Sequence, residues 1–360
     1  MTRAAAVEVV ALDPTAPTWA DDVAAWHAVY DEVARHLRAA TANPWSLDEI
    51  VVSLTAGASH TRRTAWVARA REGALPGAPQ GTVVGAGLLD LPLLDNRDTA
   101  SIAVWVPPRW RRQGVGTALA AAQEDAVRDL GRHVLQADAH TGDDAAAETA
   151  LGGLPFARAR GYEVALAGLQ SRAALPVDPA VLDRLAGEVA PHHTAYALRT
   201  WEGPVRDDLV AGYARMDALV DVEAPSGSLE VEARTAAVDV WREREAESQR
   251  QGRRNVATAA LDAGGQVVAI TELWRSTGSV QLQQWSTIVD TAHRGHRLGL
   301  AVKIANLRRA QEVWPDATEV LTWNAADNGP MLAVNEQLGF RVVERDVELQ
   351  RRLTDPSEQG

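Results

Sequence analysis

The sequence predicts an α/β protein of two similar halves, each with a mixed, mostly antiparallel sheet flanked by helices. A repeated motif is the first reason: a basic, glycine-bearing turn (RRQGVGT at 111–117, RGHRLGL at 294–300) follows an apolar run and opens a helical pattern in both halves. The copies lie 183 positions apart in a chain of 360 residues, an offset typical of a duplicated domain. The order of elements, β-α-α-β-β-β-α-β-α-β in each half, is the second reason. Three consecutive strands favour an antiparallel meander, and the strand-helix-strand unit after them favours a parallel crossover.

The first half opens with a run, AVEVVAL, that is typical of a strand. Two helical patterns follow, and Ser46 with Glu49 three residues later forms a capping box that begins the second. Three strand-like runs form the meander, and the next helix begins at the glycine turn. Helices are expected at 20–40, 46–57, 114–130 and 143–159, and strands at 6–12, 64–68, 81–91, 99–106, 133–137 and 162–169.

Residues 173–191 carry three prolines and are interpreted as a linker. Asp178-Pro179 would begin one short helix there, because proline suits the first helical turn. Domains are therefore expected at 1–172 and 192–355. In the second domain, strands are expected at 195–201, 255–261, 266–274, 280–289, 318–323 and 340–349, and helices at 205–219, 229–250, 298–313 and 329–338.

The composition is ordinary for a soluble globular protein, with 46% hydrophobic and 23% charged residues. No stretch approaches the roughly 20 apolar residues of a membrane span, and no signal peptide is evident, so a cytoplasmic protein without a membrane partner is expected. The lack of cysteine excludes disulfides, thiolate metal sites and a cysteine acyl-enzyme. A net charge of −12 argues against nucleic acid as the main partner. It favours a cationic small molecule, although acidity that only aids solubility explains it equally well.

These motifs resemble those of the GCN5-related N-acetyltransferases (GNAT), in which a strand precedes Arg/Gln-x-x-Gly-x-Gly/Ala at a helix start. The first copy fits fully from Val106 to Gly116, and the second departs once, with Arg297 in place of the first glycine. The family's second motif, a helix ending in an aromatic-x-x-x-x-Gly-aromatic pattern, is represented by FARARGY at 156–162 and VNEQLGF at 334–340. A basic glycine turn alone is a weak signal, but two copies, each followed by the second motif, are much more specific. The resemblance covers nearly the whole chain and implies a tandem member of the family.

The resemblance implies that backbone N–H groups of each glycine turn bind the pyrophosphate of acetyl-CoA at a helix start. Arg297 leaves two possibilities open: its side chain blocks the approach of a phosphate, or it adds a cation beside it. Backbone donation does not require glycine unless φ is positive there, which favours retained binding. A tight turn with helix capping is the alternative for either copy alone. The implied cofactor-binding residues are Arg111, Arg112, Gln113, Gly114, Val115, Gly116 and Thr117 in the first loop and Arg294, Gly295, His296, Arg297, Leu298, Gly299 and Leu300 in the second.

The resemblance also implies that the strand before each loop splays from its neighbour and pairs with the pantetheine arm of the cofactor. The backbone groups of Val104 and Val106, and of Ile288 and Val289, are the candidates for this pairing. One N–H there would polarise the thioester carbonyl and stabilise the oxyanion that forms on it.

Attack by an amine requires a neutral nitrogen and hence a general base. In the middle strand of the second meander, the period of two places on one face Val268, Ile270, Glu272 and Trp274. Glu272 is thus a carboxylate on an apolar face, where burial would raise its pKa into a useful range. A Glu near a strand end, exposed or paired with an arginine, is the alternative. Alignment of the two sheets places Leu88 at the matching position, so the first half lacks this acid.

Many members of the family use a tyrosine of the second motif to protonate the departing thiolate. Ala157 and Asn335 stand at that position here. Alanine is unable to serve, whereas Asn335 donates a hydrogen bond to sulfur without delivering a proton easily. Asn324 and Asn328 resemble polar residues that line the CoA arm in relatives. Asn328 is also suited to cap a helix, and the two roles are compatible.

The favoured function is acetyl-CoA-dependent N-acetylation of a primary amine on a small, cationic molecule, by direct transfer without an acyl-enzyme, in a monomer or homodimer. The second half would do the chemistry, with Glu272 and Asn335 as catalytic residues, while the first half binds CoA without turnover or is structural. A catalytically inert, regulatory CoA-binding protein is the alternative, because both halves lack the tyrosine. An NAD(P)-binding oxidoreductase is disfavoured by the glycine spacing and the meander. No His, Asp or Glu grouping has the spacing of metal ligands.

Overall fold

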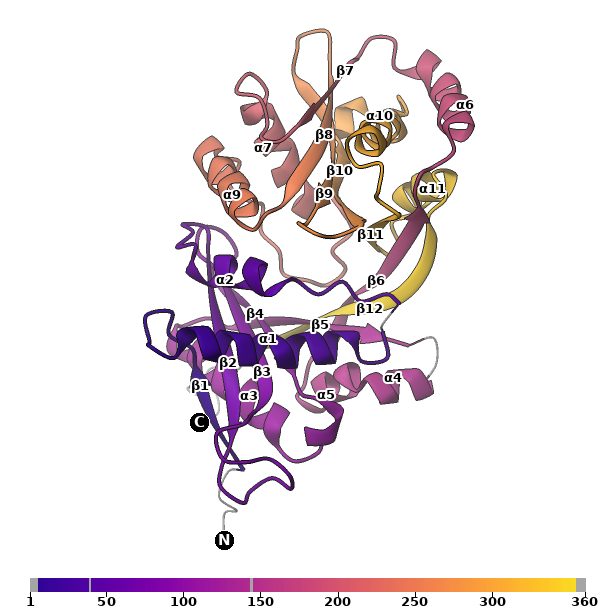
Figure 1. Ribbon diagram of the computed structural model, residues 1–360. Coiled ribbons are helices and arrows are strands. Elements are labelled where there is room, and N and C mark those ends of the chain that lie inside the picture. Colours follow the sequence, from indigo (N-terminus) through magenta and orange to yellow (C-terminus); the bar gives the residue numbers. More distant parts are fainter. Residues whose placement is uncertain (1–5, 39, 143–144, 354–360) are drawn as a thin grey trace. The chain divides into compact units, whose positions relative to one another are not determined.

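The computed structural model describes residues 6–38, 40–142 and 145–353. It divides the chain into two compact units, Met1–Ala165 with Val347–Gly360 (unit 1) and Leu166–Asp346 (unit 2). Each is a layered α/β structure, and the predicted order of strands and helices is confirmed in both halves (Figure 1). The first two residues of the helix predicted at 143–159 lie outside the described residues.

Unit 1 is built on strands in the order β1-β2-β3-β4-β5-β12. The first four strands pair antiparallel and form the predicted meander, and β4 pairs with β5 in parallel. The meander is antiparallel because short turns join its strands, whereas a helix connects β4 to β5. The strands are β1 (Val7–Ala11), β2 (Thr61–Ala70), β3 (Val83–Pro92), β4 (Thr99–Trp105), β5 (Val134–Thr141) and β12 (Arg341–Arg352).

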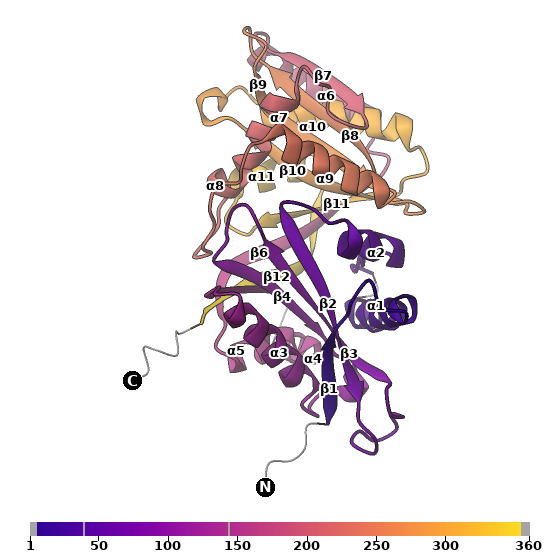
Figure 2. The same cartoon turned by 90° about the vertical axis from the view of Figure 1, so that its left-hand side faces the viewer.

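Helices cover both faces of this sheet (Figure 2). Successive residues of β2 are buried on opposite sides: Val67 lies with α1 and α2, and Ala68 lies with α3. The capping box predicted at Ser46 is present, because its hydroxyl accepts from the Glu49 amide and the Glu49 carboxylate accepts from the Ser46 amide. The helices are α1 (Trp19–Arg35), α2 (Leu47–Thr55), α3 (Val115–Asp129), α4 (Ala145–Leu151) and α5 (Gly153–Ala159), with a short 3₁₀ turn η1 (Pro108–Trp110).

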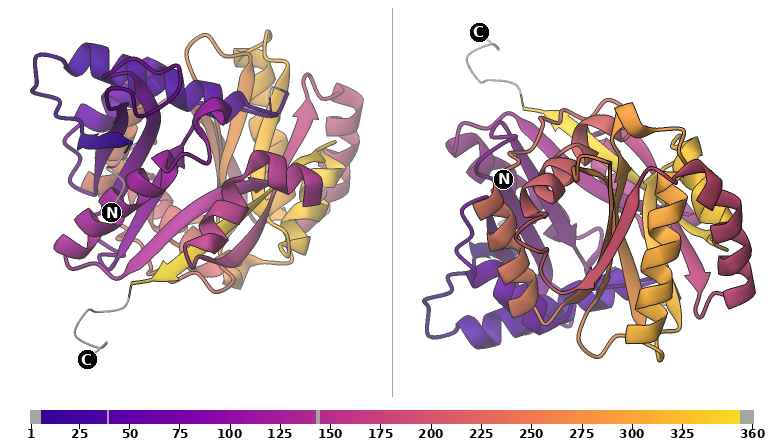
Figure 3. Two further views of the ribbon diagram at one scale, coloured as in Figure 1. Left: turned by 90° about the horizontal axis from the view of Figure 1, so that it is seen from below. Right: turned by 90° about the horizontal axis from the view of Figure 1, so that it is seen from above.

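Unit 2 is built on strands in the order β12-β6-β11-β10-β9-β8-β7. In its own meander, β7 to β10 pair antiparallel, and β10 pairs with β11 in parallel. Helices α7 and α9 lie on one face of these strands and α10 on the other (Figures 1 and 3). Ile270 of β9 is accordingly buried with Tyr213 of α7, and Leu273 is buried with Ile304 of α10.

The strands of unit 2 are β6 (Glu163–Ala174), β7 (Ala197–Glu202), β8 (Arg254–Leu261), β9 (Val267–Arg275), β10 (Gln281–Val289) and β11 (Glu319–Ala325). Its helices are α6 (Pro179–Val189), α7 (Val210–Ala218), α8 (Val220–Glu223), α9 (Val238–Arg250), α10 (Leu298–Val313) and α11 (Gly329–Gln337), with 3₁₀ turns η2 (Ala190–His192) and η3 (Thr291–His293). The loops on which the site depends are therefore the two strand-to-helix turns that precede α3 and α10.

The boundary between the units differs from the domain boundary expected at 172. β6 is longer than the strand expected at 162–169, and from Leu166 onward it belongs to unit 2, where Gly168–Ala174 pairs with β11. The chain end from Val347 returns to unit 1. A local sequence pattern indicates that a strand forms but not which sheet it joins, so the exchange of these strand ends was not foreseen.

The segment interpreted as a linker at 173–191 contains a packed helix. Asp178 caps α6 by accepting from the Ala180 amide, with proline in its first turn as expected. Leu182 and Leu185 of α6 are buried in the core of unit 2. This segment is therefore part of a domain, because the apolar face of its helix is covered.

Most helices differ from the prediction by a few residues at their ends, such as α1, expected at 20–40, and α7, expected at 205–219, and two differ more widely. The helix expected at 143–159 is broken into α4 and α5 at Gly152, whose φ of 80° is a left-handed conformation that suits glycine. The helix expected at 229–250 begins only at Val238, as α9. The residues before it include Arg234, which forms ion pairs with carboxylates of α7 and α8. Such tertiary contacts override helical periodicity.

Candidate functional site

The two glycine turns have the same backbone conformation, although glycine and arginine are exchanged between them. The first turn has positive φ at Arg112 (63°) and Gly114 (85°), and the second has it at Gly295 (86°) and Arg297 (57°). Arg112 corresponds to Gly295 and Gly114 to Arg297, because each pair is 183 positions apart. The left-handed residue before the helix is therefore retained in the second turn despite the missing glycine, at a cost of about 1–2 kcal/mol for arginine in that conformation.

The helix starts that follow the two turns have free backbone donors. The first amides of an α-helix have no partner within the helix, and among the described residues no side-chain cap is found at Gly114 for α3 or at Arg297 for α10. In contrast, Asn328 caps α11 by accepting from the Met331 amide at 3.3 Å, so the capping role expected of Asn328 is present. Uncapped N–H groups at a positive helix end form a site for an anion such as a pyrophosphate.

Arg111 and Arg294 hold their loops against the preceding strands. Arg111 Nε donates to the Val106 carbonyl at 3.1 Å, and Arg294 Nε donates to the matching Val289 carbonyl at 3.4 Å. Arg294 also pairs with Glu223 at 2.5 Å. These two side chains, expected from the sequence to bind the cofactor, are thus engaged in contacts that hold the loop.

The strand before each loop separates from its parallel neighbour after three pairs, as expected. In unit 1 the β4–β5 ladder ends at Ser101↔Gln136, and in unit 2 the β10–β11 ladder ends at Gln283↔Leu321. Beyond these pairs, β4 and β10 continue for several residues without a ladder partner on that side in the pairing that the structure describes. Val104, Ile288 and Val289 belong to these free edges, and Val106 follows directly after β4.

A β-bulge distinguishes unit 2 from unit 1 next to this edge. In unit 2, Leu273 pairs with Gln284 and Thr271 with Thr287, so that two residues of β10, 285 and 286, lie opposite Glu272 alone. In unit 1, the described β3–β4 pairs run without interruption through Leu88. Bulges re-aim side chains and occur often beside active sites. The strand pairing also supports the alignment of Leu88 with Glu272. Leu88 follows Gly87, which pairs with Val104, and Glu272 follows Thr271, which pairs with Thr287; Val104 and Thr287 are equivalent because they lie 183 positions apart.

Glu272 is a buried acid without an ion pair within the described part of the chain. Its residue is 4% exposed, and Oε2 has no hydrogen-bond partner among the described residues. Burial raises the pKa of Glu272 to about 8, helped by the charges of Asp217 and Glu245 and opposed by hydrogen bonds from Trp274 and Asn255. The expected burial is therefore present, and the exposed or arginine-paired alternative is excluded.

The period of two holds on this strand except at Val268. Val267 pairs with Leu261 and Ala269 with Ala260, so Val268 is an extra residue at an irregularity of the ladder. Val267, instead of Val268, is buried on the α7 side with Ile270, and Val268 packs with the start of α10. Glu272 and the residues after it keep the face that the sequence predicted.

Asp217 and Ser286 are functional candidates that sequence reasoning missed. Asp217 of α7 is 6% exposed and accepts a hydrogen bond of 2.8 Å from the Ser286 hydroxyl, in the bulge of β10. Arg234 and Arg244 balance its charge at 3.2 and 3.6 Å. The signal was a single carboxylate among the apolar residues of α7, and its meaning depends on the packing of that helix.

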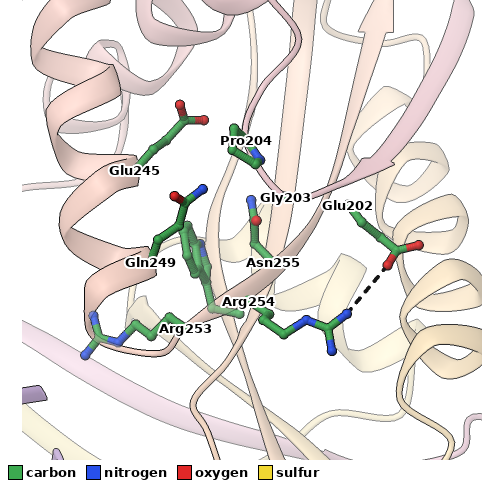
Figure 4. Close-up of a pocket in the computed structure, with 9 residues that line it drawn as sticks. Glu202, Gly203, Pro204, Glu245, Gln249, Arg253, Arg254 and Asn255 are labelled. Carbon is green, nitrogen blue, oxygen red and sulfur yellow. Dashed lines mark ion pairs between the residues drawn. The ribbon is translucent and has the colours of Figure 1, made fainter. Parts of the chain in front are cut away.

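A pocket of about 270 Å³ opens two residues along β9 from Glu272 (Figure 4). Trp274 of β9 and Asn255 of β8, which pair across the sheet, line the pocket from the sheet. Glu245 and Gln249 line it from α9 (Figure 4). Trp274 and Asn255 also form hydrogen bonds to Glu272, which does not itself line the pocket. The remaining lining residues carry both signs of charge: Glu202, Gly203, Pro204, Arg253 and Arg254, with Glu202 and Arg254 3.9 Å apart.

Three polar side chains are linked by hydrogen bonds near the opening between β10 and β11, the gap that begins where the two strands separate after Gln283 and Leu321. Lys303 Nζ donates to Asn335 Oδ1 at 2.7 Å, and Asn335 Nδ2 donates to Asn324 Oδ1 at 2.8 Å. Asn335 and Asn324, both expected in the site, are thus brought together. Lys303 was missed, because it stands in an apolar helix with no motif around it.

Unit 1 has aromatic side chains where unit 2 has its buried acids. Trp26 Nε1 donates to the Gly87 carbonyl at 2.8 Å, next to Leu88. The Trp26 ring stacks on Tyr30 with 5.4 Å between centroids and meets Trp105 edge-on at 5.6 Å. This face is therefore filled and apolar, which agrees with the absence of an acid at Leu88.

Comparisons with known proteins agree with this fold. Residues 26–152 match the acetyltransferase (GNAT) family. The chain is similar to the structure of a tandem GNAT protein from the clavulanic acid biosynthesis pathway, without AcCoA, at 27% identity over 97% of this chain and 100% of that chain, with a TM-score of 0.73. A GCN5-related N-acetyltransferase from Sphaerobacter thermophilus shares 15% identity over 96% and 95%, with a TM-score of 0.63. A glucosamine N-acetyltransferase region of a fungal GH3 β-N-acetylglucosaminidase shares 14% over 95% and 38%, with a TM-score of 0.62.

No curated protein sequence matches the chain. Within the described residues, no helix is both long enough and apolar enough to cross a membrane.

Proposed function

We propose that this chain, a tandem member of the GNAT superfamily, transfers the acetyl group of acetyl-CoA to a primary amine, with the chemistry in unit 2. The observation that carries the proposal is the position of Glu272, a buried acid opposite the bulge of β10 and beside a strand edge without a partner. Unit 1 has the edge and the loop but neither the acid nor the bulge.

The residues present fit coenzyme A. The uncapped start of α10 would hold the pyrophosphate through the backbone N–H groups of His296 to Leu300. The free edge of β10 after Gln283 would pair with the extended pantetheine arm, as a strand pairs with a sheet edge. An N–H of Ile288 or Val289 on that edge would polarise the thioester carbonyl. Acetyl-CoA, when bound, supplies the acyl group as a thioester.

Glu272 is proposed to take the proton of the attacking amine. A general base is most effective when its pKa lies near the working pH, and the pKa of about 8 satisfies this condition. The amine would enter from the pocket lined by Trp274 and Asn255, which lies two residues from the acid. A cationic acceptor is proposed on the net charge of −12, since negative protein charge raises the local concentration of cations.

The acceptor class is therefore a small molecule with a primary ammonium group. Its leaving partner, the CoA thiolate, would meet the amides of Asn335 and Asn324 at the opposite edge of the gap. Direct transfer is proposed because the chain has no cysteine to form a thioester enzyme. An inert CoA-binding protein is the second candidate, since neither Ala157 nor Asn335 delivers a proton.

The test is release of CoA thiol in the presence of an amine panel, followed with a thiol reagent; the protein contributes no background, because it contains no cysteine. Gly116→Trp and Gly299→Trp form a matched pair of variants. The positions of their Cβ atoms lie 3.5 Å from Val106 and 3.7 Å from Val289, so each indole would occupy the space beside one loop. We expect Gly299→Trp to abolish turnover and Gly116→Trp to retain it. The reverse result would place the chemistry in unit 1, and no amine-dependent release by any form would favour the inert protein.

A further inference from the structure

Lys303 of α10 is a fully buried lysine that the scheme above does not use. The residue is 1% exposed, and its Nζ lies 5.2 Å from the centre of the Phe340 ring. Burial lowers the pKa of Lys303 to about 7, and it is the only cause that shifts it, so no carboxylate described in α10, α11, β11 or β12 acts on its ammonium. Burying an unpaired ammonium is costly. The fold itself does not require a lysine there, because Ala120 occupies the matching, equally buried position of α3.

The lysine determines which atoms of the two following amides in this chain of hydrogen bonds donate and which accept. Lys303 Nζ donates to the carbonyl oxygen Oδ1 of Asn335 at 2.7 Å, a role that its N–H groups fill in the charged and in the neutral form of the lysine. Nδ2 of Asn335 must then face Asn324, where it meets Oδ1 at 2.8 Å. Because Asn324 Oδ1 is used as an acceptor, the group left at the end of the chain is its own NH₂. Every amide in the chain is oriented with its donor away from Lys303.

The end of this chain lies where a thioester sulfur would be placed under the proposed function. Asn324 is three residues beyond Leu321, the last residue of β11 that pairs with β10, so it borders the open gap. Asn335 holds the position at which the resemblance implies a proton donor for the thiolate. When the C–S bond breaks, its electron pair goes to sulfur, and N–H donors stabilise that anion, whereas amide oxygens would repel it.

We propose that Lys303 is a positioning residue for acyl transfer: it fixes the Asn335 amide, so that Asn335 and Asn324 present N–H donors to the thiolate that leaves in the gap. The inference rests on the proposed function. It accounts for a site without the family's tyrosine, because an anion held by oriented donors leaves as thiolate and needs no proton from the protein.

The test is the pKa of the CoA thiol bound to the full chain, followed through the ultraviolet absorbance of the thiolate. The chain contains no cysteine, so the signal comes from CoA alone. We expect the wild-type protein to lower the pKa of the bound thiol below that of free CoA. Lys303→Met keeps an unbranched side chain, one atom shorter and without donors. It is expected to raise that pKa by about one unit, or a roughly tenfold loss of preference for the thiolate. An unchanged thiol pKa in Lys303→Met overturns the proposal.

Asn306→Ala is the matched control. Asn306 is a second buried polar residue of α10, but its Nδ2 donates towards β8, to the Val256 carbonyl at 2.9 Å and Thr258 at 3.2 Å. Its loss is expected to lower stability without changing the thiol pKa. If Asn306→Ala shifted the pKa of the bound thiol as much as Lys303→Met does, the shift would be explained by a less rigid α10. That result would overturn the proposal.

Asn335→Leu tests the mediation and serves if Lys303→Met does not fold. It should raise the thiol pKa by the same amount as Lys303→Met, and Lys303→Met added to Asn335→Leu should give no further shift. Additive shifts would show that Lys303 does not act through Asn335. The titration requires binding but no turnover, so it separates the two hypotheses: acyl transfer without any effect at Lys303 overturns only this inference, whereas a Lys303-dependent thiol pKa without transfer overturns only the proposed function.

Discussion

The Ser286 hydroxyl, in the bulge of β10, donates a hydrogen bond of 2.8 Å to Oδ1 of Asp217, and the charge of that carboxylate raises the pKa of Glu272. Ser286 of β10, Asp217 of α7 and Glu272 of β9 thus form one connected group of polar side chains. The bulge makes the contact possible, because it places two residues of β10 opposite one of β9. Asp217 tunes the acid from a position that is itself buried.

Replacement of Asp217 by Asn should lower the pKa of Glu272. The neutral amide removes the largest charge that raises it, and a like charge nearby typically accounts for about one unit or more. The midpoint of the pH dependence of kcat should therefore move to lower pH. Asp221→Asn is the control, because Asp221 pairs with the same Arg234 and should produce a smaller shift. An equal midpoint in wild type and Asp217→Asn would contradict the coupling.

Glu272→Gln should stabilise the protein increasingly as pH rises. In the folded state the pKa of Glu272 is about 8 against an ordinary value of 4.5, so between these values the folded protein keeps a proton that the unfolded chain releases. Wild-type stability consequently falls with pH in this window, by up to about 1.4 kcal/mol per pH unit. The variant lacks this loss. Urea denaturation at pH 5 and pH 8 measures it, and a difference between wild type and variant that does not grow with pH would contradict the burial of Glu272.

Lys303→Met should change the pH dependence of stability in the opposite direction, by removing a rise of stability with pH. The pKa of Lys303 falls from 10.5 to about 7 on folding, so between these values the unfolded chain binds a proton that the folded protein lacks. Wild-type stability therefore rises with pH across that window, and the variant should lose the rise. Denaturation at pH 8.5 and pH 10 tests this, with Asn306→Ala as a buried polar control that does not titrate. The same slope in wild type and Lys303→Met would show that the ammonium is not buried.

Arg297→Gly and Arg112→Gly should each raise stability by about 1 kcal/mol. Both arginines have positive φ, 57° and 63°, a conformation that glycine adopts without strain. Gly114→Ala, at the position that matches Arg297, should have the opposite effect. Thermal denaturation measures all three. Calorimetry with CoA separates the possibilities for the Arg297 side chain: unchanged affinity in Arg297→Gly means that the backbone alone binds, tighter binding means that arginine blocks the site, and weaker binding means that it contributes a cation.

The fold and both catalytic candidates, Glu272 and Asn335, were found from the sequence because their signals are local. Alternation of apolar residues predicts β9 and places Glu272 on the face of Ile270, and the repeated turn predicts the start of α10. The position of Asn335 follows from the second motif. The first two inferences depend only on periodicity or spacing within one element, whereas Asn335 was identified through the resemblance to the family.

The remaining residues of the site depend on packing between elements. α10 is buried around most of its circumference, including Lys303 and Asn306, so no polar face marks a functional side chain. Asp217 acquires its role only where α7 lies over β9 and β10. The strand exchange at the ends of β6 and β12 leaves no local signal, because a strand pattern does not specify its sheet.

The central claim is that Glu272 accepts the proton of the amine, and the most direct test is the pH dependence of kcat for wild type and Glu272→Gln at saturating acetyl-CoA and acceptor. At saturation, kcat reports ionisations of the complex instead of the free amine. Wild-type kcat should rise with a midpoint near pH 8, and Glu272→Gln should lose that limb together with about 10²- to 10⁴-fold in rate. Asp90→Asn, at a carboxylate two residues beyond Leu88 in β3, should behave as wild type. Wild-type rates with the same pH limb in Glu272→Gln would contradict the account.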